Sequence, residues 1–319
     1  MNERLHLDFE RPIIELEKKI SDMKDFSVGE DIELTGEISS MEKKLTKLRQ
    51  EIYSNLSRWQ KVQLSRHPKR PYTLDYIKMI SHDFVELHGD RYFADDKAMV
   101  GGMAYIDGQP VMFVGQQKGR DTKAKLYRNF GMAHPEGYRK ALRLFYLAEK
   151  FDIPIVILVD TPGAFPGIGA EERGQAEAIA RNIREMSRIK VPIVIVIIGE
   201  GASGGALGIG VGDRVYMMEF AWYSVISPEG CAAILWRDAA KAPEAAEALK
   251  PTSDDLIALR IVDEVIKEPS SGAHNDPQGA ATVLKEKILS ALAELKDKPV
   301  DELLKERLAK YRTMGEFED

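Results

Sequence analysis

The 319-residue chain lacks the residues from which several common classes of site are built. Its one cysteine, Cys231, excludes an internal disulfide and a zinc site made of several cysteines, and such low cysteine usage is typical of a reducing cytosol. None of the six histidines lies in a recognisable catalytic-triad motif. No apolar run approaches the roughly 20 residues that cross a membrane, and the N-terminal residues lack the apolar core of a signal peptide. We therefore expect a cytoplasmic protein without membrane contact.

The chain also has no excess of positive charge, since its net charge is −6. A general nucleic-acid-binding surface is therefore not expected. Hydrophobic residues make up 44% of the sequence, enough for a substantial core in one large domain or two modest ones.

Apolar periodicity divides the chain into a helical arm over residues 1–66, a central domain over 67–296 and a C-terminal helix or tail over 297–319. The arm is predicted to be an amphipathic helix or a helical hairpin, with a weak break around 26–36. It either packs on its own domain or docks a partner chain. In the central domain strands alternate with helices, which predicts an α/β fold with a mostly parallel sheet. The expected helices cover 73–84, 135–151, 171–189 and 277–295, and the expected strands cover 98–106, 110–116, 154–159, 193–198, 214–220 and 223–226.

Two glycine-rich segments follow neighbouring predicted strands. One is Thr161–Gly169, and the other is Gly199–Gly205, after which a short buried helix is expected. Because parallel strands end at the same edge of a sheet, two backbone N–H groups from these segments could converge on one oxygen as an oxyanion hole. The alternative is that Gly204 and Gly205 only permit close packing of helix against strand.

Other patterns leave alternatives open. Gly199, Gly201 and Gly204 match the G-x-G-x-x-G dinucleotide motif, although the helix that follows is short, whereas a P-loop is excluded because no Lys-Ser or Lys-Thr follows the glycines. Ser203 is either a nucleophile or, more simply, a helix N-cap. Asp160 is either catalytic or the cap of its own turn. The polar loop 117–128 is basic, and it forms either a solvated surface or a site for a small polyanion such as coenzyme A.

Longer motifs carry a family resemblance over nearly the whole chain. They are QKGRDTK from Gln117, RNFGM from Arg128, PEGYRKALRL from Pro135, DTPGAFPG from Asp160, GAEERGQAEAIARN from Gly169, GEGASGGALGIGVGD from Gly199 and YSVISPEGC from Tyr223. With these motifs the chain resembles the alpha subunits of the bacterial and plastid type of acetyl-CoA carboxylase carboxyltransferase.

The resemblance implies a crotonase-like (ClpP/crotonase) fold of repeated ββα units in the central domain, with the N-terminal helices as an extension. It implies transfer of a carboxyl group from carboxybiotin to acetyl-CoA, giving malonyl-CoA, the first committed step of fatty-acid synthesis. The implied partners are a beta subunit in an α2β2 assembly, a biotin carboxyl carrier protein and biotin carboxylase. Zinc is expected only on the beta subunit and no metal on this chain. No Ala-Met-Lys-Met biotinylation motif is present, so biotin is expected to arrive on the carrier.

The resemblance also implies residue roles. Backbone N–H groups of Gly204 and Gly205 are expected to stabilise the biotin ureido oxyanion. The biotin pocket is expected to be formed by Gly163, Ala164, Phe165, Gly167, Gly201 and Ser203. Contacts to coenzyme A or to the subunit seam are expected from Lys118, Arg120, Lys123 and Arg128. The competing hypotheses are a stand-alone crotonase-like acyl-CoA enzyme, which needs its own acid or base, a dinucleotide-binding protein, and a scaffold that acts through its helical arm.

Overall fold

A computed structural model of the chain describes residues 6–30 and 34–315, with the side chains of 28–30 left aside. A single mixed sheet forms the centre of the molecule, in the strand order β1-β2-β3-β4-β5-β6-β8, with β7 paired to β5. The first three strands are antiparallel and the other pairings are parallel. The strands are β1 (His82–Glu86), β2 (Met99–Ile106), β3 (Gln109–Gln116), β4 (Ile155–Thr161), β5 (Ile193–Ala202), β6 (Arg214–Met218), β7 (Trp222–Ser224) and β8 (Glu264–Ile266).

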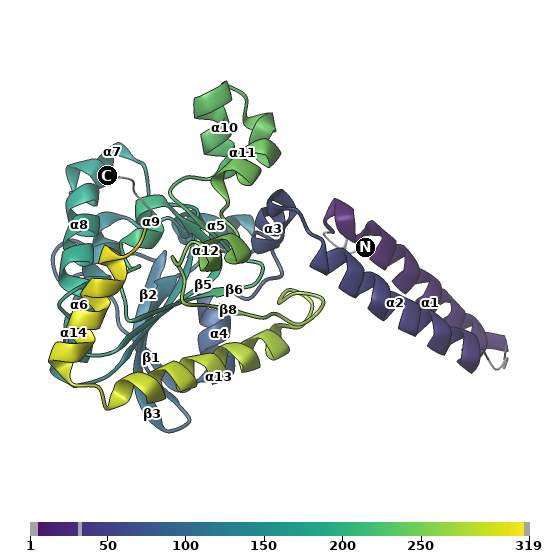
Figure 1. Cartoon of the computed structure of the whole chain (residues 1–319), viewed down its shortest axis with the longest axis horizontal. Coiled ribbons are helices and arrows are strands. Elements are labelled where there is room, and N and C mark those ends of the chain that lie inside the picture. The colour runs from purple at the N-terminus through teal and green to yellow at the C-terminus, as the bar shows by residue number, and fades with distance from the viewer. Residues whose placement is uncertain (1–5, 31–33, 316–319) are drawn as a thin grey trace.

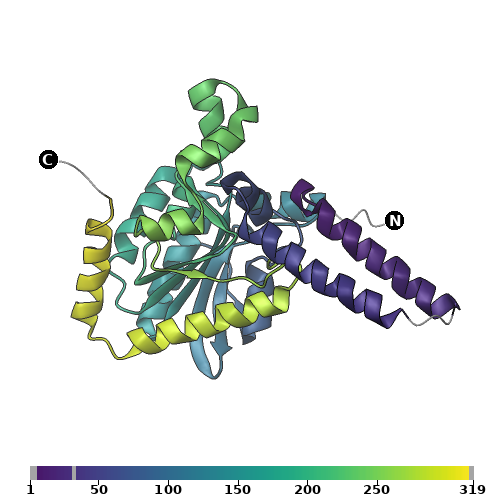
Figure 2. The same ribbon diagram turned by 45° about the vertical axis from the view of Figure 1, so that its right-hand side comes forward.

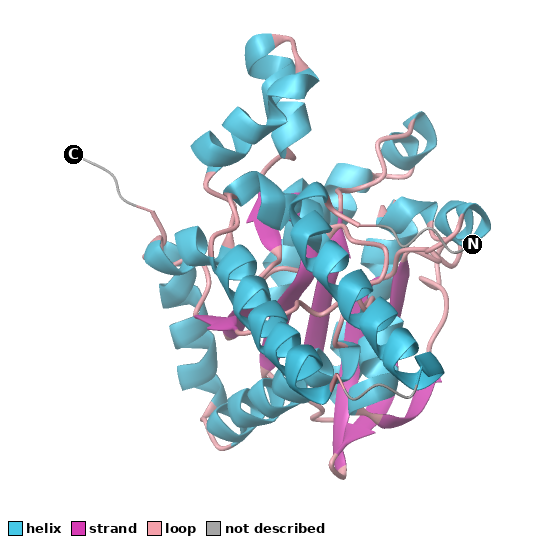
Figure 3. Ribbon diagram, turned by 90° about the vertical axis from the view of Figure 1, so that its right-hand side faces the viewer, coloured by secondary structure: helices cyan, strands magenta, loops and turns pink. Residues whose placement is uncertain are grey.

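Helices cover both faces of this sheet (Figures 1 and 3). A Cβ on Gly101 would touch Leu144 of α6 (Pro135–Lys150), whereas one on Gly115 would touch Thr73 of α4 (Thr73–Ile80). Gly101 pairs with Val114, the neighbour of Gly115, so α6 and α4 lie on opposite faces. On the α6 face lies α8 (Gln175–Met186), and α13 (Pro277–Lys296) packs beside α4. The strands β4 and β5 are wholly buried between these layers, as their β-branched runs predict.

The first two long helices form a hairpin that projects from the rest of the molecule (Figure 2). These helices are α1 (Arg11–Glu30) and α2 (Thr35–Ser54), preceded by a short 3₁₀ turn, η1 (Asp8–Glu10). The predicted hairpin is therefore confirmed, apart from residues 1–5 and 31–33, which lie outside the described residues. At its base, Tyr53 packs on Phe220 of the central domain.

The residues after the hairpin belong to the main body. The helix α3 (Arg58–Ser65) lies against the sheet, because Val62 packs on Ala202 and Trp222. At the other end of the chain, α14 (Val300–Arg312) is fixed by Arg307, whose guanidinium is buried against Asp213 with N–O distances of 2.7 and 2.8 Å. The division into an arm (1–66), a central domain (67–296) and a tail (297–319) stays a prediction.

A second projection is made of short helices beyond the sheet (Figures 1 and 2). It consists of α10 (Pro228–Trp236), η3 (Ala239–Lys241) and α11 (Ala242–Leu249), followed by α12 (Ser253–Ala258). Ser227 caps α10, since its Oγ accepts the N–H of Gly230 at 3.1 Å. No helix among the described residues combines the length and the apolar character that a membrane span requires.

Several predicted boundaries are wrong. The helix expected over 73–84 ends at Ile80, and Phe84 lies in β1. The loop 117–128 contains a helix, α5 (Thr122–Tyr127), capped by Asp121 and followed by η2 (Asn129–Gly131). The helix expected over 171–189 is divided into α7 (Ile168–Glu172) and α8, because Gly174 takes a left-handed conformation between them. Asp107 and Gly108 form the turn between β2 and β3, and both residues have the positive φ of a tight hairpin.

Candidate active site

The two glycine-rich segments meet at one edge of the sheet, as expected from parallel strands. Thr161 at the end of β4 pairs with Gly201 near the end of β5. Beyond these residues, Gly205 touches the other segment so closely that a Cβ on it would lie 2.3 Å from the carbonyl carbon of Gly163 and 2.5 Å from the nitrogen of Ala164. No real Cβ tolerates such distances, so the contact requires glycine at this position.

The strand β5 is longer than predicted, and this changes the interpretation of the glycine motif. It continues through Ala202, so Gly199 and Gly201 are strand residues rather than parts of a turn. Both make room for neighbours, since a Cβ on Gly199 would lie 2.5 Å from Asp160 Oδ1 and one on Gly201 would lie 2.8 Å from the ring of Tyr223. The G-x-G-x-x-G spacing therefore reflects close packing, not the phosphate-binding turn that a dinucleotide site requires.

A five-residue helix, α9 (Ser203–Leu207), follows directly. Its N-cap is Ala202, so the expectation that Ser203 is the cap is wrong. Ser203 is exposed and has a φ of 57°, a strained conformation that clusters at functional sites. Within the described chain it makes no hydrogen bond to a histidine, so the arrangement of a Ser-His nucleophile is not seen there. The first N–H groups of a helix have no acceptor within it, and those of Gly204 and Gly205 belong to this set.

Two side chains that the sequence did not single out hold the Gly205 end of this element. The carbonyl of Gly205 accepts hydrogen bonds from Gln116 Nε2 at 3.1 Å and from the hydroxyl of Tyr138 at 3.2 Å. Gln116 also accepts the N–H of Asp160 at 3.1 Å through its Oε1 and so connects the two segments. The available signal was that Gln116 is a polar residue at the end of a strand, β3, whose neighbour β4 ends in the first glycine segment.

The first glycine segment is fixed by the start of α6 and by α8. The N–H of Phe165 donates to the carbonyl of Ala133 at 3.1 Å, and Gln175 Nε2 donates to the carbonyl of Phe165 at 3.0 Å. The ring of Phe165 packs edge-on against His134, with ring centroids 4.1 Å apart. Gly167 lies under the same ring, because a Cβ there would be 2.5 Å from it.

A cavity of about 650 Å³ opens beside α9, a volume within the range of small-molecule sites. Of the residues expected around biotin, Ser203 and Gly204 line it, whereas Gly163, Ala164, Phe165, Gly167, Gly201 and Gly205 do not. The rest of the wall is mostly apolar and comes from β6, β7, the end of α11, α12 and α14. It includes Leu207, Val215, Tyr223, Val225, Leu249, Leu256, Leu259, Ile261, Tyr311 and Met314.

Beneath the two segments lies a buried ionic cluster. Lys118 Nζ lies 2.6 Å from Asp160 Oδ1 and 2.6 Å from Glu200 Oε2, and Glu200 also accepts a hydrogen bond from Arg66 Nε at 2.6 Å. Burial alone would raise the pKa of Glu200, but the charges of Lys118 and Arg66 outweigh it and lower that pKa. For Asp160 burial dominates, so its pKa is raised despite the Lys118 ammonium.

This cluster gives Asp160 a structural task. Its Oδ1 accepts the N–H of Glu200 at 3.0 Å and so joins the ends of β4 and β5, rather than capping its own turn. The ammonium of Lys118 pairs with two carboxylates of its own chain, and its expected contact with coenzyme A or the subunit seam stays a prediction.

The other three basic residues of the expected coenzyme A contact lie in different settings. Arg120 pairs with Asp75 at 2.6 Å, and its guanidinium lies over the ring of Tyr72. Arg128 donates to the carbonyl of Lys97 at 2.8 Å. Lys123 is exposed on α5. The structure therefore does not gather the four cations around one point, and a coenzyme A contact by Arg120, Lys123 or Arg128 stays a prediction.

Comparisons with known proteins show the family of the chain. The family model described as acetyl co-enzyme A carboxylase carboxyltransferase-like matches residues 6–315. The acetyl-coenzyme A carboxylase carboxyl transferase subunit alpha of Geobacter metallireducens is 59% identical over 317 residues, which cover 99% of both chains. The protein of the same name from Chlorobium phaeobacteroides is 56% identical over the full length of both chains.

Solved structures share the fold. The transcarboxylase 12S core, crystallised with methylmalonyl-coenzyme A, matches with a TM-score of 0.57 and 25% identity over 70% of this chain, which spans 41% of that longer chain. A Pseudomonas malonate decarboxylase hetero-tetramer in complex with coenzyme A matches with a TM-score of 0.56 and 18% identity, over 73% of this chain and 90% of that one. The fold is that of the crotonase-like carboxyltransferases. With relatives matched from end to end, the chain belongs to the family of acetyl-CoA carboxylase carboxyltransferase alpha subunits.

Proposed function

We propose that this chain, paired with a beta subunit, transfers a carboxyl group from carboxybiotin to acetyl-CoA and so forms malonyl-CoA. The full-length relatives named as alpha subunits of this enzyme support the proposal. The structural observation that carries it is the contact of Gly205 with Gly163, which places the start of α9 against the neighbouring segment, beside a cavity of about 650 Å³.

The proposed chemistry depends on backbone groups of this chain. When the carboxyl group leaves carboxybiotin, negative charge develops on the ureido oxygen. We assign its stabilisation to the N–H groups of Gly204 and Gly205, because preorganised donors of this kind are each worth about 2.7–4 kcal/mol in the transition state. In the proposed reaction the carboxyl group would leave as CO2, the freed biotin nitrogen would take a proton from the acetyl methyl group, and the resulting enolate carbon would attack the CO2 to form the new carbon–carbon bond. This removal of the proton needs no side-chain base, which is consistent with a site in which Ser203 makes no hydrogen bond to a histidine among the described residues.

The partners are part of the proposal. The name of an alpha subunit implies a second subunit, and we propose an α2β2 assembly in which the beta subunit carries a zinc of its own and completes the coenzyme A site. Biotin would arrive on a separate carrier protein that also serves a biotin carboxylase. In this assembly we assign part of the subunit contact to α10, because Ile234, Leu235 and Trp236 expose 71%, 64% and 40% of their surface. Exposed apolar residues grouped in this way are typical of interaction surfaces.

The experiment compares the isolated chain with the chain co-purified with a beta subunit, using decarboxylation of malonyl-CoA in the presence of biocytin as the assay. Activity is expected only in the pair, and full activity of the isolated chain would contradict the proposal in favour of a stand-alone acyl-CoA enzyme.

A variant of Gly204 tests the role of the glycines. A Cβ on Gly204 would meet only Ile179, at 3.6 Å, so Gly204→Val is expected to fold and to assemble. It would lower turnover on the order of 10²–10³-fold, because the side chain lies where the oxyanion must approach. Gly36→Val in the hairpin, where a Cβ has no neighbour within 4 Å, is the control. Normal turnover of Gly204→Val would remove the glycine pair from the mechanism.

A further inference from the structure

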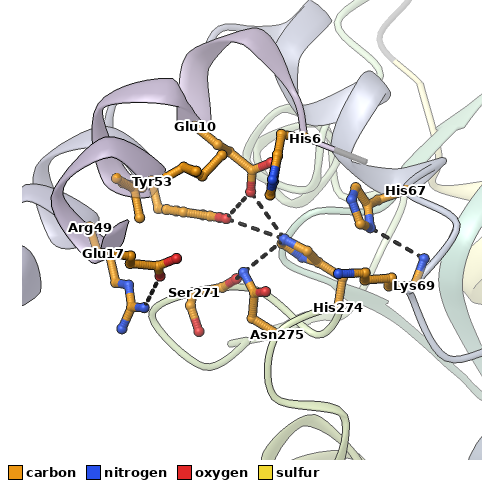
Figure 4. Close-up of a pocket in the computed structure, with 12 residues that line it drawn as sticks. His6, Glu10, Glu17, Arg49, Tyr53, His67, Lys69, Ser271, His274 and Asn275 are labelled. Atoms are coloured by element: carbon orange, nitrogen blue, oxygen red, sulfur yellow. Dashed lines mark hydrogen bonds and ion pairs between the residues drawn. The ribbon is translucent and has the colours of Figure 1, made fainter. Parts of the chain in front are cut away.

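A second polar cluster, which shares no residue with the cavity beside α9, lies where the base of the helical hairpin meets the central domain (Figure 4). Glu10 comes from η1, His67 from the connection between α3 and α4, and His274 from the loop between β8 and α13. Each offers one ligand atom, and these atoms all lie within 4.8 Å of one another. The three residues are only 4–6% exposed, and a charged side chain is rarely buried to this extent unless it is paired or binds an ion.

The geometry points to a site for one transition-metal dication, of which Zn²⁺ is the preferred occupant, bound by Glu10, His67 and His274. Two imidazoles and one carboxylate make a donor set that zinc uses, whereas Mg²⁺ and Ca²⁺ prefer oxygen ligands. The rings of His67 and His274 lie side by side with centroids 4.4 Å apart. The site goes beyond the proposed carboxyl transfer and takes no part in it.

Metal ligands in proteins are usually fixed in orientation by hydrogen bonds from neighbouring groups. The carboxylate of Glu10 is held in this way. Glu10 Oε1 accepts the hydroxyl hydrogen of Tyr53 at 2.6 Å, and its Oε2 accepts the N–H of Leu7 at 2.9 Å. The backbone N–H of Lys69 lies 3.3 Å from His67 Nδ1, a long contact that would give way to a metal bond at that nitrogen.

His274 is incompletely satisfied by hydrogen bonds. Its Nε2 lies 3.1 Å from Glu10 Oε1 and 2.9 Å from Asn275 Nδ2. Its Nδ1 is buried and has no hydrogen-bond partner among the described residues. A buried polar atom of this kind calls for a water or an ion.

There is room for the ion and for a further ligand. The cluster lines a cavity of about 230 Å³, and His6 is part of the same wall. His6 or a water molecule would complete a tetrahedral shell. The other charged groups on the wall are Glu17, which pairs with Arg49, and Lys69.

The proposed ion would connect the helical hairpin to the central domain. Glu10 immediately precedes α1, whereas His67 and His274 belong to the body of the molecule. An ion held by all three would therefore fasten the hairpin to the central domain, and its binding free energy would stabilise the docked arrangement.

The test uses the full isolated chain, treated with a chelator, so that no zinc of a beta subunit interferes. Titration with Co²⁺ is expected to give the visible absorption bands of a tetrahedral centre, saturating at one equivalent, and one equivalent of Zn²⁺ is expected to abolish them. Zn²⁺ is also expected to slow hydrogen exchange in α1 and α2, whereas Mg²⁺ is expected to do neither.

Two variants and one control make the result specific. His67→Ala/His274→Ala is expected to lose the Co²⁺ bands. Glu10→Gln, which keeps an acceptor for Tyr53, is expected to weaken Zn²⁺ binding by about 10–100-fold or more, the range found for groups that support a metal site. The control replaces two exposed histidines, in His82→Ala/His88→Ala, and should bind as the wild type does. Absence of the bands from the folded wild type, or equal binding by Glu10→Gln, would overturn the proposal and leave a purely hydrogen-bonded cluster.

Discussion

Gly205 lies against the backbone of Gly163, and no atom fits between them. A Cβ on Gly205 would come within 2.3 Å of the Gly163 carbonyl carbon, whereas one on the neighbouring Gly204 would meet only a side chain at 3.6 Å. Two adjacent glycines therefore have different tasks. Gly205 joins the ends of β4 and β5, and Gly204 lines the cavity.

This difference predicts opposite outcomes for two alanine variants. Gly205→Ala must displace the backbone of Gly163 and Ala164, so we expect it to lower the free energy of unfolding by about 1–3 kcal/mol and to reduce turnover as well. Gly204→Ala is expected to keep its stability within about 0.5 kcal/mol of the wild type. Urea denaturation followed by tryptophan fluorescence measures both, and equal stabilities for the two variants would contradict the close contact.

The Lys118 ammonium neutralises two buried carboxylates, so its removal is expected to destabilise the fold strongly. In Lys118→Met, Asp160 loses its cation and Glu200 keeps only Arg66, so we expect a loss of about 3–5 kcal/mol of stability, as for other broken buried ion pairs. Addition of Asp160→Asn should restore part of the loss, because one uncompensated charge disappears. Lys123→Met, on the exposed surface of α5, is the matched control and should unfold like the wild type. A small effect of Lys118→Met would mean that water reaches the cluster.

Much of the sheet edge was predictable, because it follows from local patterns. The apolar runs of β4 and β5 mark buried parallel strands, and parallel strands end at one edge, so the meeting of the two glycine segments follows from the sequence. The limits of β5 did not follow. Because glycine is conformationally free, a glycine-rich segment suggests a turn. Gly199 and Gly201 instead lie in a strand, where Asp160 and Tyr223 occupy the space that a side chain at these positions would need. Only the tertiary contact distinguishes these two reasons.

The side-chain assignments show the same limit. The basic composition of residues 117–128 is visible in the sequence, but the direction of each side chain is not. Lys118 turns into the buried cluster, and Arg120 turns toward Asp75. In the same way, Glu10, His67 and His274 are distant in sequence and share no motif, so only the docking of the hairpin brings them together. The roles assigned to Gly163, Ala164, Phe165, Gly167, Gly201, Ser203, Gly204 and Gly205 stay predictions.

The exposed face of α10 predicts an effect on assembly but not on folding. We expect Ile234→Asp to weaken the affinity for a beta subunit by at least tenfold, because a charge would replace an apolar contact at the proposed interface. The isolated variant should unfold like the wild type, since Ile234 is 71% exposed. Analytical ultracentrifugation of mixtures measures the affinity. Val300→Asp on α14, which also replaces an exposed apolar residue, is the control, and equal affinities for the two variants would exclude α10 from the interface.

Asp90 predicts a specific loss of stability in acid. Its Oδ1 accepts the N–H groups of residues 92–94 at 2.7–3.1 Å, and its Oδ2 accepts Arg139 Nε at 2.8 Å. Burial raises the pKa of Asp90, but these hydrogen bonds and the Arg139 charge outweigh it, so the pKa lies below its ordinary value of 3.8. A carboxyl group with a lowered pKa stabilises the fold fully above its unfolded pKa, and this contribution is lost as the pH falls below 3.8 toward the folded pKa.

Asp90→Asn should therefore lower the urea midpoint at pH 7. Its difference from the wild type should shrink as the pH falls below 3.8, because the carboxyl group of residue 90 is then protonated in the unfolded wild type while it is still charged in the folded protein. Asp83→Asn, at an exposed carboxylate, is the control and should follow the wild type at every pH. A difference between Asp90→Asn and the wild type that stays constant down to pH 3 would show that the hydrogen-bond geometry, and not the charge, is what residue 90 contributes.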